Sequence, residues 1–327
     1  MATKIIQRGK QRFYPKQPAF LQLRTAKARC IWRRGDHNAF TDLVLFRGAL
    51  FCVFREAYAH VSPDGALRIL KSSNGGKDWH SVACIHSDSA DLRDGKLIQM
   101  PDGRLQLLGA GALHDRTHGS HQSFIWLSDD GEHWSDAIPC GEINIWLWRL
   151  TWQQDTAWAV GYSCFADRYV RLYKSDDGVN FAPWVSTLNN AGYVNESGLL
   201  FLPDGRAMCL LRRDPHVGLL GIASPPYFDW QWRELNKRIG GPACIQLPDG
   251  RILAAVRLYD YQVRTSLCWL DLDNATLREC LVLPSGGDTS YPGLVLDQGL
   301  LHISYYSSHQ GKTAVYYSQV RLDALKD

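Results

Sequence analysis

The 327-residue sequence has no long hydrophobic run. No stretch approaches the roughly 18 consecutive apolar residues of a membrane-spanning helix. The basic stretch over residues 4–16 lacks the apolar segment of a secretory signal peptide. We therefore expect a cytoplasmic protein with no membrane partner.

Sequence motifs for metal binding are also lacking. The chain has nine cysteines but no Cys-x-x-Cys and no His-x-x-x-His spacing, so nothing in the sequence points to zinc. Several cysteines, such as Cys52 and Cys209, lie within apolar runs and are expected to be reduced and buried. We predict no metal ion and no other cofactor.

A strong charge of either sign is likewise absent. The net charge is +3, 21% of the residues are charged, and the basic residues beyond the first segment are scattered. Without a basic stripe, nucleic acid is not an expected partner. The composition carries no indication of an oligomeric state.

What the sequence does contain is a repeated turn motif. Asp or Asn followed by Gly favours a tight turn, through side-chain hydrogen bonds and a positive φ, and an aromatic residue closes each copy. The copies lie about 50 residues apart, which is the spacing of propeller blades. The three clear copies and one faint copy are residues 72–79, 128–134, 175–181 and 224–230.

A second repeat consists of hairpin turns with an apolar segment on each side. Such turns between β-rich segments predict antiparallel hairpins. Six of them at blade-like spacing predict an all-β protein, a six-bladed β-propeller with four-stranded antiparallel blades, in a single domain over residues 1–327. Residues 28–33 would supply the outer strand of the last blade, which closes the ring and removes its free edges. The turns are centred on residues 47, 102, 155, 204, 249 and 298, and the blades are expected to start near residues 40, 91, 146, 194, 241 and 289.

This topology predicts which residues surround one mouth of the ring. The first strand of each blade starts at that mouth, and the second strand ends there. Charged and aromatic residues would therefore converge near the axis, where propellers bind ligands. The strand starts include Thr41-Asp42, Arg93-Asp94, Trp148-Arg149, Asn195-Glu196, Gly241-Pro242 and Ser290-Tyr291.

Three arginines share one position in this repeat. Arg55, Arg212 and Arg257 each stand seven residues after the glycine of their hairpin turn. Clustered guanidinium groups repel one another unless an anion lies between them, and their geometry matches a carboxylate or a phosphate. The pattern indicates an anionic ligand.

The repeated turn resembles the Asp box of the sialidase superfamily, Ser-x-Asp-x-Gly-x-x-Trp, which is a structural element there. Further segments are similar to those that carry the catalytic residues of this family. The resemblance implies an exo-acting glycoside hydrolase with Tyr291 as nucleophile and Glu196 as its base, and with Arg212 and Arg264 on the substrate carboxylate.

The chemistry that this resemblance implies has a physical reason. The anomeric carbon of a sialoside carries a carboxylate, which would repel an anionic nucleophile. A neutral tyrosine avoids the repulsion, but its pKa of about 10 requires a neighbouring base. Sialidases with a tyrosine nucleophile are a recognised exception to the scheme of two carboxylates for glycosidases.

The general acid and the first arginine of the family are less well matched. Asp64, in the loop after the second strand of blade one, is the nearest match to the acid, with His60 and Glu56 as alternatives. The family's Arg-Ile-Pro motif is missing, and Asp42 stands close to its place. Arg55 or Arg93 could substitute for the missing arginine, while Asp42 could favour a hydroxyl or an amine.

Three functions thus stay open. The first is hydrolysis of a terminal sialic acid or another acidic sugar. The second is carbohydrate binding without catalysis, with Trp146, Trp148 and tyrosines at the mouth as stacking surfaces. The third is a different reaction on an acidic sugar that uses His60. In each case the partner is a glycan, and Arg93, Asp94 and Arg257 are further candidates for binding it.

Overall fold

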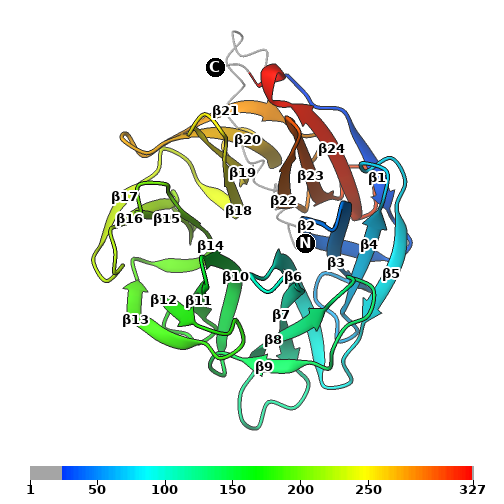
Figure 1. The fold of residues 1–327 in the computed structure, drawn as a ribbon, viewed down its shortest axis with the longest axis horizontal. Coiled ribbons are helices and arrows are strands. Elements are labelled where there is room, and N and C mark those ends of the chain that lie inside the picture. The colour runs from blue at the N-terminus through cyan, green and yellow to red at the C-terminus, as the bar shows by residue number, and fades with distance from the viewer. Residues whose placement is uncertain (1–23, 326–327) are drawn as a thin grey trace, which may run out of the picture.

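The computed structural model describes residues 24–325, and within this range the chain forms six four-stranded antiparallel sheets arranged in a ring (Figure 1). This architecture confirms the prediction of a six-bladed β-propeller. The first three blades are β2 (His37–Phe46), β3 (Ala49–Ala57), β4 (Ala66–Ser72) and β5 (His80–Ile85); β6 (Ala90–Gln99), β7 (Leu105–Leu113), β8 (His121–Ser128) and β9 (Ile138–Cys140); and β10 (Ile145–Gln153), β11 (Thr156–Ser163), β12 (Val170–Ser175) and β13 (Ala182–Asn189).

The other three blades repeat this order, and the last takes its fourth strand from the start of the described chain. Strand β1 (Ala28–Trp32) pairs with β24, so both ends of the described chain lie in one sheet and the ring is closed. A short 3-10 turn, η1 (Leu322–Ala324), follows. These blades are β14 (Tyr193–Phe201), β15 (Ala207–Asp214), β16 (Leu219–Ala223) and β17 (Trp230–Glu234); β18 (Ile239–Gln246), β19 (Ile252–Leu258), β20 (Arg264–Asp271) and β21 (Thr276–Val282); and β22 (Thr289–Asp297), β23 (Leu300–Ser307), β24 (Ala314–Arg321) and β1.

The hydrophobic core lies between neighbouring blades. Between blades one and two, for example, Phe51 and Leu67 pack in one cluster with Leu107 and Trp126. All four side chains are buried, and each stabilises the fold by about 1.5–3 kcal/mol through the removal of apolar surface from water. Because every blade packs on two neighbours, the ring fixes the position of each inner strand relative to the axis.

The two repeats of the sequence occupy equivalent places in the blades. The six hairpin turns join the first and second strands, as predicted, with Gly48 and Gly205 in the left-handed region at φ 77° and 85°. The repeated turn motif joins the third and fourth strands. In its third copy, Asp177 Oδ1 accepts hydrogen bonds from the backbone N–H groups of Val179 and Asn180, at 2.8 and 2.7 Å. This bonding explains why an acidic or amide residue recurs there.

Two further findings concern the described residues as a whole. None of their helices has the length and apolarity needed to cross a membrane. All nine cysteines fall within residues 24–325, and none of them forms a disulfide there.

Candidate functional site

Each of the six inner strands contains a β-bulge at the same level. In β2, the register shifts between Ala39 and Asp42, so that two residues of the inner strand oppose one residue of β3. The other five inner strands shift register at the equivalent place. A bulge turns its extra residue away from the regular alternation of a strand. The bulge residues are Phe40-Thr41, Asp94-Gly95, Trp148-Arg149, Asn195-Glu196, Gly241-Pro242 and Tyr291-Pro292.

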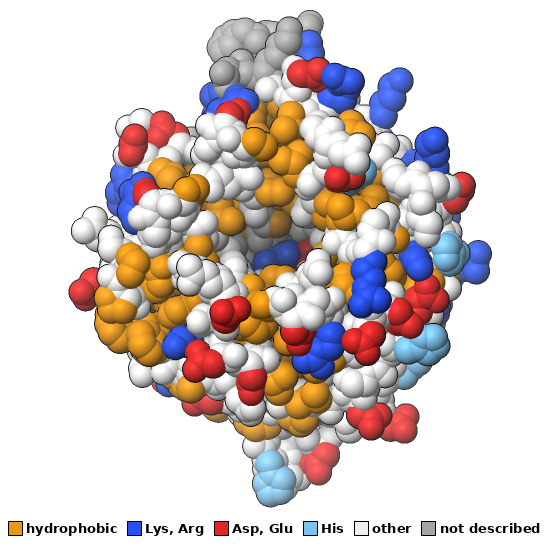
Figure 2. All heavy atoms as spheres, in the orientation of Figure 1, with side chains coloured by type: hydrophobic (Ala, Val, Ile, Leu, Met, Phe, Trp, Pro, Cys, Tyr) orange, Lys and Arg blue, Asp and Glu red, His pale blue; other side chains and the backbone are white. Residues whose placement is uncertain are grey.

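These bulges bring side chains from separate blades together around Tyr291. Its ring centroid lies 5.1 Å from that of Phe40 and 5.4 Å from that of Trp148. The backbone of Phe40, Asp94 and Tyr291 is left-handed, with φ between 51° and 63°, and residues with side chains adopt this conformation only where their surroundings impose it. The space-filling view shows that the ring is hollowed at its centre, with charged side chains visible in the hollow (Figure 2).

The central contact of this site is a hydrogen bond from the Tyr291 hydroxyl to Glu196 Oε1. The other oxygen, Oε2, accepts a hydrogen bond from the Gly241 backbone N–H at 2.7 Å. Burial would raise the pKa of Glu196, but the nearby Arg212 guanidinium and the Tyr291 hydroxyl hold it below the usual value. The pKa of Tyr291 is raised well above its usual value by burial and by the Glu196 charge. The pair therefore consists of a neutral hydroxyl that already donates to an ionised carboxylate.

Three cationic side chains surround this pair. Arg212 Nη1 lies 2.5 Å from Glu196 Oε1, whereas the Arg257 guanidinium carbon and Lys96 Nζ lie 5.6 and 5.8 Å from the centroid of the Tyr291 ring. The structure thus brings Arg212 and Arg257 of the predicted arginine set to one place. An anionic group next to Tyr291 would meet a positive field there.

Arg55 has a different role from the predicted one. Its side chain is fully buried, and Nε and Nη2 donate to Asp91 Oδ1 at 2.9 and 2.8 Å. Nη1 donates to the Ala59 carbonyl oxygen at 2.8 Å, and Nη2 also contacts the Ser62 carbonyl oxygen at 3.1 Å. All of its donors serve the protein, so Arg55 fixes the loop of residues 58–65 and does not replace the missing arginine.

Arg264 is likewise not brought to the mouth. It begins β20, the third strand of its blade, and donates two hydrogen bonds to Glu279 on the outer strand β21, at 2.7 and 2.6 Å. It also contacts Asp260 at 2.6 Å and lies 3.6 Å from the centroid of the Tyr261 ring. This guanidinium is fully buried among its own partners, an arrangement that favours a structural role over contact with a substrate carboxylate.

Two further candidates are Asp64, in the loop after the second strand of blade one, and Arg93, on the first strand of blade two. Asp64 is exposed and accepts a hydrogen bond from the Tyr58 backbone N–H at 3.0 Å. Its pKa is lowered, chiefly by a hydrogen bond from Ser62, so Asp64 is ionised at neutral pH and is poorly suited as a general acid. Arg93 donates to Asp91 at 2.6 Å and to the His60 carbonyl oxygen at 3.0 Å. It also lines an open pocket of about 700 Å³ that extends to Trp146.

Asp94 is better suited than Asp64 as a general acid, because its pKa is raised and not lowered. It is buried, and burial together with the Glu196 charge raises its pKa from 3.8 to about 6, although Lys96 opposes the shift. Burial and Arg149 in turn lower the pKa of Lys96 to about 8. The neighbouring Asp42 accepts hydrogen bonds from Arg149 Nη1 and from the Leu97 backbone N–H, both at 2.9 Å. These contacts connect the first three blades.

The raised pKa of Asp94 makes a prediction for the stability of the protein. Between pH 3.8 and about 6, the folded state retains a proton that the unfolded state has lost. This contribution to stability is therefore complete below the unfolded pKa and disappears as the pH rises through the folded one. Asn does not titrate, so it keeps the stability that the wild type loses as the pH rises. Between pH 4 and pH 7, the unfolding free energy of Asp94→Asn should therefore increase by roughly 1–3 kcal/mol relative to that of wild type.

Urea unfolding at several pH values would measure this difference. Asp64→Asn is the matched control, because the pKa of Asp64 is shifted in the opposite direction. The control should lose stability relative to wild type over the same pH interval. A difference between Asp94→Asn and wild type that does not change with pH would show that Asp94 is ionised throughout.

Sequence reasoning missed Lys96, His37 and Asp288 at the mouth. Lys96 had a usable signal, since a lysine just before the apolar pair Leu97-Ile98 of an inner strand is unusual. His37 and Asp288 immediately precede or begin inner strands, and only the ring closure brings them together.

Comparison with known proteins adds information on the fold alone. No protein-family model matches the chain, and no curated protein matches it in sequence. Among solved structures, a protein of unknown function from Dyadobacter fermentans superposes with a TM-score of 0.81 at 19% identity, over 92% of this chain and 100% of that one. An α-L-arabinanase of Penicillium chrysogenum, complexed with arabinobiose, gives 0.69 at 15% identity over 94% and 100% of the two chains. The NanB sialidase of Streptococcus pneumoniae gives 0.67 at 9% identity over 91% and 71%. The chain thus shares a six-bladed propeller fold with glycoside hydrolases that include sialidases and arabinanases.

Proposed function

We propose that the protein is a retaining exo-glycoside hydrolase that releases a terminal acidic sugar, either a sialic acid or a related one, with Tyr291 as nucleophile. The observation that carries this proposal is the hydrogen bond from the partly buried Tyr291 hydroxyl to the ionised Glu196. A tyrosine bonded to a carboxylate base, with cations around it, is what attack by a phenol oxygen requires.

The reaction then needs two proton transfers. The Tyr291 oxygen bonds to the anomeric carbon while Glu196 accepts the phenolic proton, and the bond to the leaving oxygen breaks. Asp94 supplies the proton for that oxygen, since its pKa of about 6 keeps a protonated fraction near neutral pH. Water then hydrolyses the glycosyl–tyrosine bond, and the protons return to Tyr291 and Asp94.

Arg212 and Arg257 support the choice of an acidic sugar. Both are partly exposed at the site, and their guanidinium groups lie on the side of Tyr291 and Glu196. Two arginines would bind the carboxylate in place of the three that the sialidase resemblance implies. Arg55 and Arg264 are fully buried, whereas the side chains of Arg212 and Arg257 are 15% and 13% exposed. With two arginines instead of three, the carboxylate of the substrate would have fewer charged contacts than the sialidase resemblance implies.

Removing these arginines should weaken an acidic ligand selectively. Each charged hydrogen bond contributes about 1.5–3 kcal/mol, so Arg212→Ala and Arg257→Ala should each raise the Kd of an acidic sugar roughly tenfold to a hundredfold. A neutral analogue without the carboxylate should bind both variants almost as well as it binds wild type. Calorimetric titration measures both, and equal losses for the two ligands would contradict a carboxylate contact.

A second mechanism on the same residues is favoured by one observation. The pKa values of Asp94 and Glu196 are shifted apart, the first upward and the second downward, as in glycosidases with two carboxylates. In that case Glu196 would be the nucleophile and Asp94 the acid, and a neutral terminal sugar such as arabinofuranose would fit. Tyr291 would then only orient Glu196.

Carbohydrate binding without catalysis has less support. The two tryptophans expected as stacking surfaces are buried, and Trp146 already stacks on Tyr162 with ring centroids 5.9 Å apart. This burial leaves both rings little surface for stacking on a sugar, although Trp146 borders the open pocket.

The proposed function is tested by the release of a fluorophore from a set of glycosides. The set should include a sialoside, a glucuronide and an arabinofuranoside, assayed between pH 5 and 7. We expect turnover of an acidic glycoside by wild type and none by Glu196→Gln. Turnover of the arabinofuranoside alone would favour the mechanism with two carboxylates, and binding without release of any compound would overturn the assignment as an enzyme.

A further inference from the structure

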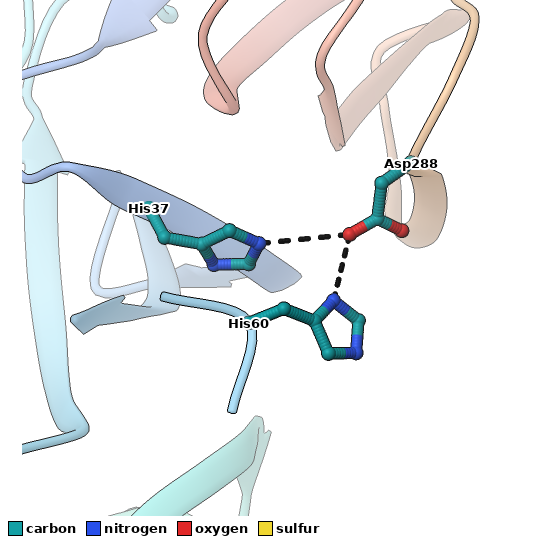
Figure 3. Close-up of side chains that lie close together, drawn as sticks. All are labelled: His37, His60 and Asp288. Carbon is teal, nitrogen blue, oxygen red and sulfur yellow. Dashed lines mark hydrogen bonds and ion pairs between the residues drawn. The ribbon is translucent and has the colours of Figure 1, made fainter. Parts of the chain in front are cut away.

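Two histidines and an aspartate converge at the rim of the mouth, outside the proposed catalytic pair. His37 begins β2, His60 lies in the loop after β3, and Asp288 immediately precedes β22. His60 Nδ1 lies 2.8 Å and His37 Nε2 lies 3.5 Å from the same oxygen, Asp288 Oδ2 (Figure 3). One ligand atom from each residue lies within 4.8 Å of the other two.

The two separations from Asp288 Oδ2 are close to the spacing of ligands around one metal ion. Zinc binds nitrogen and oxygen ligands at about 2.0–2.2 Å, so two ligands of a tetrahedral site lie roughly 3.3 Å apart. The two measured separations fall on either side of this value. Imidazole nitrogens with one carboxylate oxygen are a set that divalent transition metals prefer, whereas magnesium and calcium prefer oxygen alone.

His37 provides an independent reason to expect an ion. Its ring is buried, and its Nδ1 has no hydrogen-bond partner among the described residues. Its Nε2 lies 3.5 Å from Asp288, beyond the usual range of a hydrogen bond. An ion between the three ligand atoms would bind the buried Nε2, which otherwise has no good polar contact, whereas Nδ1 lies on the other side of the ring from the ion.

The surroundings hold the three ligands in place. Asp288 Oδ1 accepts a hydrogen bond from the Tyr306 hydroxyl at 2.8 Å and lies 3.4 Å from Arg257 Nη2, which leaves Oδ2 facing the histidines. The Phe40 ring packs edge-on against His60, with 5.2 Å between ring centroids. Outer contacts of this kind orient metal ligands.

Two further features bear on access and charge. The side chain of His60 is 51% exposed and that of Asp288 is 30% exposed, so an ion can enter from solvent and keep an open coordination position. Arg93 and Arg55 donate to the carbonyl oxygens of His60 and Ala59, which fixes the loop that carries His60. Arg257 is a nearby cation that opposes an ion, and it lies 3.4 Å from the other oxygen of Asp288, Oδ1.

We propose that His37 Nε2, His60 Nδ1 and Asp288 Oδ2 bind a divalent transition-metal ion of the zinc type, with its open position toward the mouth. This site does not depend on the roles of Tyr291 and Glu196. Both imidazoles must be neutral to bind the ion, so the affinity falls as the solution becomes more acidic.

The test is a calorimetric zinc titration of tag-free full-length protein that has been stripped with a chelator. We expect one ion per chain for wild type. Asp288→Asn and His37→Gln should each weaken binding at least roughly tenfold, because even residues that only support a ligand contribute about 10–100-fold. His133→Ala is the matched control, since His133 lies 2.8 Å from Asp130 without a second histidine, and it should bind zinc like wild type.

Two more measurements keep the outcome unambiguous. When cobalt(II) replaces zinc in the protein, the absorption spectrum should lack the intense thiolate band that binding to a cysteine would produce. If the buried variants do not fold, His60→Ala changes an exposed loop residue and should lose the ion while it retains the wild-type circular dichroism spectrum. No zinc binding by wild type, or unchanged binding by His60→Ala, would overturn the proposal whatever the glycoside assays show.

Discussion

Tyr291→Phe is expected to lower kcat by at least roughly 10³-fold, because it removes the nucleophilic oxygen and leaves the shape of the site intact. The ring packs against Phe40 and Trp148 through its faces and edges, and these contacts remain. Glu196 keeps its hydrogen bonds with Arg212 and with the Gly241 backbone N–H. Steady-state kinetics on the best substrate of the glycoside set, together with thermal unfolding, would measure the effect.

The same variant distinguishes the two mechanisms. If Glu196 is the nucleophile, Tyr291→Phe removes only one hydrogen bond and should cost far less than Glu196→Gln. If Tyr291 is the nucleophile, Tyr291→Phe should cost at least as much as Glu196→Gln. A wild-type rate for Tyr291→Phe would refute the tyrosine mechanism, and an unfolded variant would show that the hydroxyl serves the core. Mass spectrometry of the protein trapped with a slow substrate would locate the covalent sugar on one of the two residues.

The fold could be predicted because local signals repeat along the chain. Each hairpin turn has Gly or Asp at a fixed place, as Gly205 illustrates. The three clear copies of the outer turn have an acceptor such as Asp177 for the backbone N–H groups. Such requirements depend on a few neighbouring residues. The hairpin turn occurs six times and the outer turn motif three times at blade-like spacing, and together they predict a propeller with six blades.

The site was predicted less completely because its contacts depend on neighbouring blades. Arg55 and Arg257 occupy the same position in their blades, but Arg55 meets Asp91 of the next blade, whereas Arg257 meets Tyr306 and the Tyr291 ring. The spacing along the sequence does not reveal these partners. The bulges of the inner strands, which include Asp94 and Tyr291, also leave no clear mark on the sequence.

The burial of Arg264 leads to the second large expected effect, which is on stability. Arg264 is fully buried, and the side chain of its partner Glu279 is only 7% exposed. Arg264→Ala would leave that carboxylate buried without its counter-charge, which typically costs about 3–5 kcal/mol of unfolding free energy. Arg206→Ala is the matched control, because its pair with Asp204 has side chains 44% and 50% exposed and should contribute no more than about 1 kcal/mol.

Urea unfolding of both variants tests this assignment, and a second substitution sharpens it. Adding Glu279→Gln to Arg264→Ala removes the uncompensated charge and should restore part of the lost stability. Folded Arg264→Ala should still bind an acidic sugar like wild type, because the guanidinium lies on the third and fourth strands of its blade, away from Tyr291. A variant with wild-type stability but a much weaker affinity for acidic sugars alone would instead place Arg264 in the binding site, as the sialidase resemblance implies. The two outcomes separate a residue that holds the blade together from one that holds the substrate.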